Sequence, residues 1–389
     1  MSTPQDPETP EATEPEVAQG ASDRRARRIE HYPPEWGPKN RPARQPAQRG
    51  HAKWTIGLVA LAVVVALSIT AIVLFNGNDT ASSASNQVPA PTSGSSPTAT
   101  TDATDSSVIA SADDVGPVSI VTSDVTCQSF DDIQKTLVAA QSKGWNDRDA
   151  SVPGSAWTPT QRTQYEAVGQ AITDTIDAAV TLAKKTPHRV MRELYETYVA
   201  YGRAYADSLA QYQPADDFLA RTSVAAFQSI SAICRSVVSA AAQARAPGIP
   251  AVAPPTDAPT VGDPANPDRF LPQAGPTCGR WIPAVAELQA ATQTWAALDP
   301  KIPESNWTPD QRATQTAVGP LLTDAANTVE AAGRGSGYPV FEDFATLAAL
   351  YYRAYALAIS SYTPHDYDLA LAGLQLDDLI ASACRAASG

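Results

Sequence analysis

The chain contains an internal repeat, because residues from about 145 to 235 recur 150 positions later in the same order. The shared residues include Trp145, Trp157, Arg162, Gly169, Asp174, Tyr201, Arg203, Tyr205, Tyr212 and Cys234, matched by Trp295, Trp307, Arg312, Gly319, Asp324, Tyr351, Arg353, Tyr355, Tyr362 and Cys384. So many identities at one constant offset indicate a tandem duplication. The chain must therefore form one fold twice, and the shared positions are those that both copies retain.

A long apolar segment precedes both copies. Residues 54–75 read WTIGLVALAVVVALSITAIVLF, which is 22 residues without a charged side chain. At about 1.5 Å per residue, a helix of this length crosses a hydrocarbon core of about 30 Å. A cleaved signal peptide is the alternative, but the long preceding segment and the length of the apolar stretch favour an uncleaved transmembrane helix.

The flanking charges predict the orientation of this helix in the cell (plasma) membrane. Nine Lys or Arg residues precede it, whereas the next one along the chain is Lys135. The positive-inside rule therefore predicts a disordered cytoplasmic tail, residues 1–53, with the rest of the chain outside. The formal net charge of the whole chain is −13, and the tail is close to neutral. The exterior part is thus acidic, which argues against a nucleic-acid partner.

Segments rich in proline and small residues divide the exterior part. Residues 76–117 are nearly all Ser, Thr, Ala, Asp, Asn, Val, Gly and Pro, and we predict a disordered stalk. Residues 244–274 form a Pro/Ala-rich linker that its prolines stiffen. The two helical repeats then occupy residues 118–243 and 275–389, and we expect two separate domains joined only by the linker.

All four cysteines lie in the exterior part, one near the start and one near the end of each copy: Cys127, Cys234, Cys278 and Cys384. An even number in an oxidising compartment predicts disulfides, and the duplication favours pairing within each copy. Each bond would close a loop of about 107 residues and stabilise the fold by about 4–5 kcal/mol. A zinc or redox site is disfavoured, since there is no CxxC motif and no histidine near a cysteine.

Helix signals dominate each copy. Thr158, Pro159 and Gln161 fit a capping box with proline at the first helical position, and the second copy repeats the pattern. With stops at Gly144 and Pro187, the sequence predicts four helices per copy. Four consecutive helices with short connections favour an up-down-up-down bundle. The predicted class is all-α, with two tandem disulfide-stapled four-helix-bundle-like repeats outside one transmembrane helix.

The third predicted helix of each copy carries tyrosines on one face. Tyr201 and Tyr205 recur as Tyr351 and Tyr355, and a spacing of four places each pair on the same side of a helix. We interpret this stripe as a seam of the core. A groove lined by tyrosine that binds a ligand or a partner is the alternative.

Two further shared pairs suggest specific contacts. Arg203 and Arg353 are predicted to pair with Asp174 and Asp324 on the preceding helix, since an isolated buried charge is costly. An anionic ligand is the alternative partner of each arginine. In addition, Trp157 is predicted to pack over Arg162 as a staple with cation–π character, repeated in the second copy.

Candidate catalytic groups are scarce. The exterior part has only two histidines, His188 and His365, and they do not occupy matching positions. The sequence therefore offers no Ser-His-Asp, Cys-His or histidine-metal constellation. We predict that the protein is not an enzyme and that it uses neither a cofactor nor a metal.

The order of tail, single span, stalk and cysteine-paired helical domain resembles that of uncharacterised single-pass cell-envelope proteins of actinobacteria such as mycobacteria. This resemblance rests on layout and composition, and it implies no activity and no functional residue. We predict a non-enzymatic, membrane-anchored binding or scaffold protein that engages an envelope protein or an apolar or anionic ligand through both modules. The alternatives are a signalling or recruitment protein whose output is the cytoplasmic tail, and a small-molecule or lipid carrier that uses the tyrosine seam.

Overall fold

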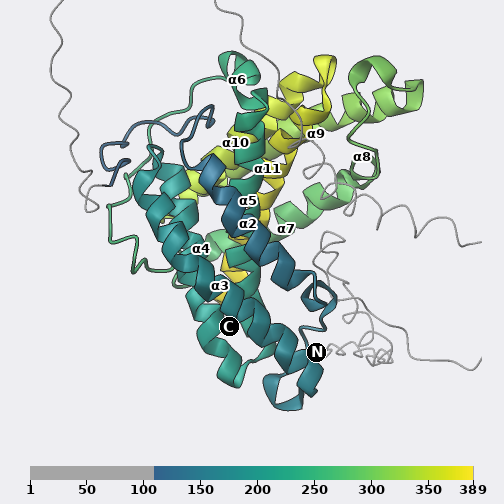
Figure 1. Cartoon of the computed structure of the whole chain (residues 1–389). Helices are drawn as coiled ribbons and strands as arrows, with labels where there is room; N and C mark the ends of the chain where they lie inside the picture. The colour runs from purple at the N-terminus through teal and green to yellow at the C-terminus, as the bar shows by residue number, and fades with distance from the viewer. Residues whose placement is uncertain (1–108, 389) are drawn as a thin grey trace, which may run out of the picture. The chain divides into compact units, whose positions relative to one another are not determined.

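The computed structural model describes residues 109–388 (Figure 1). The predicted cytoplasmic tail, the predicted transmembrane helix at 54–75 and most of the predicted stalk lie outside the described residues. The described part consists of α-helices, short 3-10 turns and loops, and it contains no β-strand. This confirms the predicted all-α class.

Each copy contributes four main helices, and short helices accompany them. The first copy contains α2 (Cys127–Gln141), α3 (Pro159–Lys185), α4 (Arg189–Ser208), α5 (Asp217–Val238) and the short α6 (Ala241–Arg245). The second copy contains α7 (Pro276–Ala291), the short α8 (Gln293–Ala296), α9 (Pro309–Arg334), α10 (Pro339–Ala358) and α11 (Tyr367–Ala386). The four main helices of one copy thus have counterparts in the other, as the duplication predicts.

The long helices α3 and α9 begin where the sequence signals place them. The Gln161 N–H donates to the Thr158 hydroxyl at 3.2 Å, and the Thr158 N–H donates to the Gln161 side chain at 2.9 Å. Thr308 and Gln311 make the same two bonds at 3.2 and 2.9 Å. These contacts confirm both capping boxes, which satisfy amide groups that the first helical turn leaves unpaired.

Both predicted disulfides are present. Cys127 joins Cys234 with a Cα–Cα distance of 5.1 Å, and Cys278 joins Cys384 with a distance of 5.4 Å. Each bond ties the first main helix of a copy to the last one. The pairing within copies is therefore confirmed.

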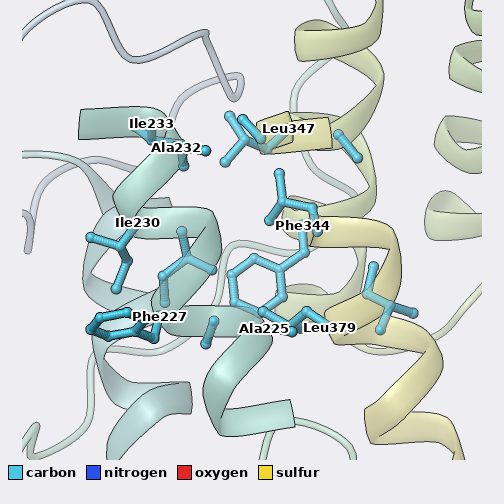
Figure 2. Close-up of a cluster of buried hydrophobic side chains, with 14 of the residues drawn as sticks. Ala225, Phe227, Ile230, Ala232, Ile233, Phe344, Leu347 and Leu379 are labelled. Atoms are coloured by element: carbon cyan, nitrogen blue, oxygen red, sulfur yellow. The ribbon is translucent and has the colours of Figure 1, made fainter. Parts of the chain in front are cut away.

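The expectation of two separate domains is wrong, because the two copies share one hydrophobic core. Helix α5 of the first copy packs along α11 of the second, and α10 of the second copy contacts α4 and α6 of the first (Figure 1). Figure 2 shows α5, which carries Ala225, next to the helices that carry Phe344 of α10 and Leu379 of α11. The physical reason lies in α5 itself, since 17 of its 22 residues are buried. A helix that is buried on nearly all sides needs neighbours beyond a single small bundle.

The contacts between the copies are reciprocal. Arg235 donates to the Asp368 carboxylate at 2.8 Å, while Arg385 lies over the Phe218 ring at 5.7 Å. Arg385 is the counterpart of Arg235, and Asp368 is the counterpart of Phe218. Such an exchange of equivalent positions is the signature of an isologous, twofold interface. The two copies are therefore arranged like the subunits of a homodimer joined in one chain.

The linker between the copies lies on the folded surface. Arg334 donates to the Ala253 carbonyl at 3.0 Å. The Phe270 ring lies 5.9 Å from the Tyr201 ring and 5.3 Å from the Phe344 ring. Residues of both copies thus hold the linker along its length.

The last part of the predicted stalk is also packed in the structure. The Ala110 N–H donates to the Lys184 carbonyl at 2.9 Å, and Arg189 donates to the Gly116 carbonyl at 3.1 Å. Val121, shortly after these residues, is fully buried. The structure therefore differs from the prediction of disorder at residues 109–117, because the apolar residues that follow them anchor this segment to the core.

Within residues 109–388, no single helix is both long and apolar enough to cross a membrane. By length and composition alone, the stretches Pro214–Val238 and Ala241–Gly248 meet that test as a pair bent by 72°.

Candidate functional site: the seam between the two copies

Tyr201 and Tyr351, the first tyrosine of each seam, lie beside the segment that begins or precedes the other copy. The Tyr201 hydroxyl donates to the Leu271 carbonyl, just ahead of the second copy, at 3.5 Å. In the matching place, the Tyr351 hydroxyl lies near the Val121 backbone and Ser236, without a hydrogen bond to any described residue. Burial raises the pKa of both tyrosines, and these polar contacts oppose the rise. The segment that precedes each copy is therefore packed beneath the other copy.

The inner tyrosine of each seam is held within its own copy. Trp145 donates through Nε1 to the Tyr205 hydroxyl at 3.1 Å. Trp295 donates likewise to Tyr355 at 2.9 Å, and Tyr355 donates to the Gln315 side chain at 2.8 Å. All four seam tyrosines are fully buried. Their phenol groups thus occupy the core, where those of Tyr201, Tyr205 and Tyr355 hydrogen-bond to protein groups.

The predicted pair between Arg203 and Asp174 is wrong. Arg203 donates to the Ala265 carbonyl of the linker, and Asp174 accepts from Gln170 at 2.6 Å. Asp174 lies on the exposed face of α3, so it does not face α4. Arg203 therefore holds the linker in place.

The predicted pair between Arg353 and Asp324 is also wrong. Arg353 donates to the Glu330 carboxylate at 2.7 Å and to the Asn327 side chain at 2.9 Å, both on α9. Asp324 lies on the exposed face of the same helix. The shared arginines have thus acquired different partners, a linker carbonyl in one copy and α9 side chains in the other.

The predicted staple is present in both copies. The Arg162 guanidinium lies 5.6 Å from the Trp157 ring, and the Arg312 guanidinium lies 5.8 Å from the Trp307 ring. In the first copy, Trp157 also stacks on Tyr165 with ring centroids 4.0 Å apart. The staple therefore closes the aromatic end of each bundle.

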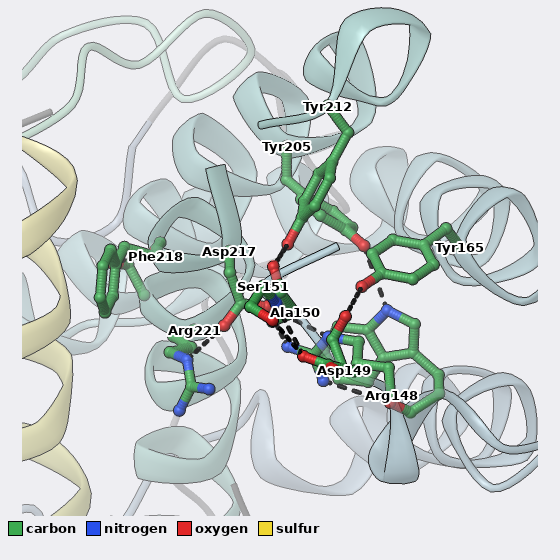
Figure 3. A network of polar contacts seen from close by, with 12 residues as sticks. Arg148, Asp149, Ala150, Ser151, Tyr165, Tyr205, Tyr212, Asp217, Phe218 and Arg221 are labelled. Carbon is green, nitrogen blue, oxygen red and sulfur yellow. Dashed lines mark hydrogen bonds and ion pairs between the residues drawn. The ribbon is translucent and has the colours of Figure 1, made fainter. Parts of the chain in front are cut away.

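A charged network that the sequence reasoning missed lies in the first copy (Figure 3). The Arg148 guanidinium lies 3.4 Å from the centre of the Trp145 ring and donates through Nε to Asp217 at 3.1 Å. Arg221 pairs with the same carboxylate. Burial alone would raise the pKa of Asp217, but the two arginines outweigh burial and hold the pKa below its ordinary value. Asp217 is therefore ionised at neutral pH although it is buried.

The second copy replaces this network with uncharged side chains. Leu298, Tyr367 and Leu371 stand at the positions of Arg148, Asp217 and Arg221. Tyr367 packs near Trp295, with ring centroids 6.0 Å apart. The signal was visible in the sequence as matched positions where only one copy is charged. The network is therefore a specialisation of the first copy and not a requirement of the fold.

A second charged cluster lies where α4 meets α10. Arg189 donates to Asp343 at 2.7 Å through Nε and at 3.2 Å through Nη2. Burial raises the pKa of Asp343, and Arg189 opposes that rise. Beside Arg189, segments 113–119 and 187–190 line a polar hollow of 350 Å³. The cluster thus connects the interface between the copies to the surface.

Asp377 of α11 is a third buried carboxylate. It accepts a hydrogen bond from the Tyr352 hydroxyl, and its other oxygen has no hydrogen-bond partner among the described residues. Burial raises the pKa of Asp377 to about 8, although the Tyr352 bond opposes the rise. The first copy has Phe227 and Gly202 at these two positions. Asp377 is therefore protonated at neutral pH.

We expect Asp377→Asn to remove a pH dependence of stability. Asp377 keeps its proton up to about pH 8 in the folded chain, whereas the ordinary pKa of its carboxyl is 3.8. The free energy of unfolding of the wild type therefore falls as the pH rises from about 4 to about 8. The loss is at most about 1.4 kcal/mol per pH unit. Urea unfolding of the full-length chain at pH 5 and pH 8 should show that the variant gains stability over wild type at the higher pH. The exposed Asp131→Asn is the control, and an equal difference at both pH values would contradict the prediction.

Comparison with known proteins identifies a family and a relative that match most of the chain. Residues 109–388 match the sequence family described as Mycobacterial ESX-1 associated protein. An uncharacterised protein of Mycolicibacterium smegmatis (strain MKD8) is 41% identical over 360 residues, which is 92% of each chain. No solved structure matches the chain. The family match spans both copies and the linker between them.

Proposed function

The chain belongs to the mycobacterial ESX-1 associated protein family, and from this premise we propose that it is a non-enzymatic binding or scaffold protein that serves ESX-1 secretion. Its two-copy domain works outside the cell membrane, to which the predicted helix at 54–75 anchors it. Family membership is the observation that carries the secretion-related role. The partner is then an envelope protein associated with that secretion system.

The two disulfides support an extracytoplasmic site of action. Structural disulfides persist in oxidising compartments and are rare in the cytoplasm of mesophiles. Both bonds close within a copy. The apolar 54–75 segment, with its basic flank, supports an anchor in the plasma membrane. The alignment with the relative covers 92% of this chain and so includes that segment.

The way the copies pack supports a single composite binding surface. Two tethered modules would gain affinity by binding the same partner independently, but here α5 and α11 join the copies in one core. The shared tyrosines are buried and the shared arginines hold a linker carbonyl or α9 side chains. A partner would therefore contact surface residues other than these shared tyrosines and arginines.

The experiment is gene deletion and complementation in a mycobacterium that has ESX-1. We expect deletion to lower the amount of ESX-1 substrates in the culture filtrate, and the full-length chain to restore it. A chain without residues 54–75, produced at the same level, should fail to restore it. Secretion that is unchanged by the deletion would contradict the proposal. A chain that lacks residues 1–40 but keeps the four basic residues nearest the span tests the signalling alternative, which requires the tail for output. The retained residues are Arg41, Arg44, Arg49 and Lys53.

A further inference from the structure

Glu193 of α4 and Asp343 of α10 occupy the same position in the two copies, since they are 150 residues apart. They meet at the interface between the copies, where both carboxylates lie beside Arg189 Nε, at 3.8 Å for Glu193 and 2.7 Å for Asp343. In a twofold arrangement, a residue near the axis meets its own counterpart. The axis of this protein therefore brings two acidic side chains together.

The hydrogen bonds around this pair are unequal. Arg189 donates to both oxygens of Asp343. The nearest guanidinium nitrogens to the Glu193 carboxylate are Arg192 Nη2 at 3.6 Å and Arg189 Nε at 3.8 Å, beyond hydrogen-bond length. Neither Glu193 oxygen accepts a hydrogen bond within residues 109–388, and the side chain is only 1% exposed.

An ionised carboxylate that is buried without hydrogen-bond donors is costly, whereas a protonated carboxyl group supplies an O–H donor of its own. Asp343 still has lone pairs that can accept this O–H. Two carboxylates in contact cannot readily both be ionised, so one proton resolves both the repulsion and the missing donor. Burial raises the pKa of Glu193, and the proximity of Asp343 raises it further.

The surrounding charges do not remove the need for this proton. The charged groups that face the pair are Arg189, Arg192 and Glu196 of α4, Glu342 of α10 and Asp114 of the N-terminal segment. Glu342 pairs with Arg334 of α9 at 3.2 Å, and Asp263 of the linker faces Glu196. Carboxylates thus outnumber guanidinium groups around the contact between α4 and α10.

We propose that Glu193 and Asp343 share one proton that locks α4 to α10, and that loss of this proton loosens the contact between the two copies. The interface is then a pH-sensitive switch, closed at acidic pH and weakened as pH rises. This pH dependence goes beyond the proposed function, because it concerns how tightly the two copies that form the binding surface are held together. The pair titrates as a unit, so the switch belongs to both residues together.

Hydrogen exchange of the full-length chain tests this proposal. Amides of α4 and α10 are followed at pH 6, 7 and 8 and corrected for intrinsic exchange rates. We expect the opening equilibrium constant of the wild type to rise by up to about tenfold per pH unit below the folded pKa of the pair, since opening releases one proton. Glu193→Gln keeps a donor toward Asp343 but cannot ionise, so its opening constant should rise less steeply with pH than that of the wild type, by up to one proton. Glu196 and Asp377, whose pKa values are also raised, titrate alike in both proteins.

The controls separate this proton from others. Glu166→Gln, on the exposed face of α3, should keep the wild-type slope. Asp343→Asn should lower the slope likewise, because Glu193 can then ionise beside Arg189 without a second carboxylate. If Glu193→Gln fails to fold, the comparison of wild type with Asp343→Asn still decides. A wild-type slope of zero, or a slope in the folded Glu193→Gln or Asp343→Asn variant that equals the wild-type slope, overturns the proposal.

Discussion

Asp217→Ala should lower the free energy of unfolding by about 3–5 kcal/mol, because removal of one member of a buried ion pair leaves the other charge uncompensated. The Arg148 side chain is only 5% exposed, and it lies against the Trp145 ring. It therefore has no route to solvent without breaking the end of the bundle. Urea unfolding of the full-length chain at pH 7 measures the loss.

The second copy provides the matched control for this prediction. The triple variant Arg148→Leu, Asp217→Tyr and Arg221→Leu installs the residues found at the same positions in the second copy. Replacement of a buried ion pair by well-packed apolar groups is often neutral or stabilising. We therefore expect the triple variant to recover most of the loss. A loss below about 1 kcal/mol for Asp217→Ala would contradict the prediction, since it would show that this buried ion pair stabilises the fold no more than a surface ion pair does.

The loss on Asp217→Ala should depend on pH with a defined sign. Arg148 and Arg221 hold the pKa of Asp217 below its ordinary value. The stabilisation by the ionised carboxylate is therefore complete when the pH is above the ordinary pKa of aspartate. It declines as the pH falls through the lower pKa that Asp217 has in the folded chain. The difference between wild type and variant should narrow at acidic pH.

Loss of one disulfide should destabilise both copies together. The Cys278–Cys384 bond spans 106 residues, and the chain-entropy model assigns about 4–5 kcal/mol to a loop of this length. Because α5 and α11 share one core, Cys278→Ser with Cys384→Ser should shift a single cooperative transition. Urea unfolding followed by near-ultraviolet circular dichroism and by tryptophan fluorescence measures whether the two signals coincide.

The first copy again offers the control. Cys127→Ser with Cys234→Ser opens a loop of 107 residues, so the model predicts nearly the same loss. If only half of the signal shifted in either double variant, the copies would unfold independently, and the shared core would not be cooperative.

Features that depend on neighbours in the sequence could be predicted. The capping boxes at Thr158 and Thr308 follow from local patterns of a few residues, and the disulfide pairing follows from the position of one cysteine at each end of a copy. The staple of Trp157 on Arg162 is local as well. Short-range geometry and the duplication are enough for such features.

The interface between the copies could not be predicted in the same way. Comparison of matched positions shows what each copy needs by itself, whereas the contact of Arg235 with Asp368 joins positions that do not match. That two copies share a residue also does not say on which face of its helix the residue lies. The predicted pair of Asp174 with Arg203 is wrong for this reason, since Asp174 lies on the exposed face of α3. The available signal was the composition of residues 217–238, which are mostly apolar or small and leave no broad polar face. Such a helix indicates a larger core than one bundle.

The two disulfides also determine what covalent connection the copies have with each other. All four cysteines are used within copies, so the backbone between Arg245 and Pro276 is the one covalent bridge from copy to copy. A protease that cut this bridge would produce two separate polypeptides, even without reduction. The apolar contact of α5 with α11 would still hold them as a heterodimer. Cleavage of the linker would thus leave the two folded copies associated.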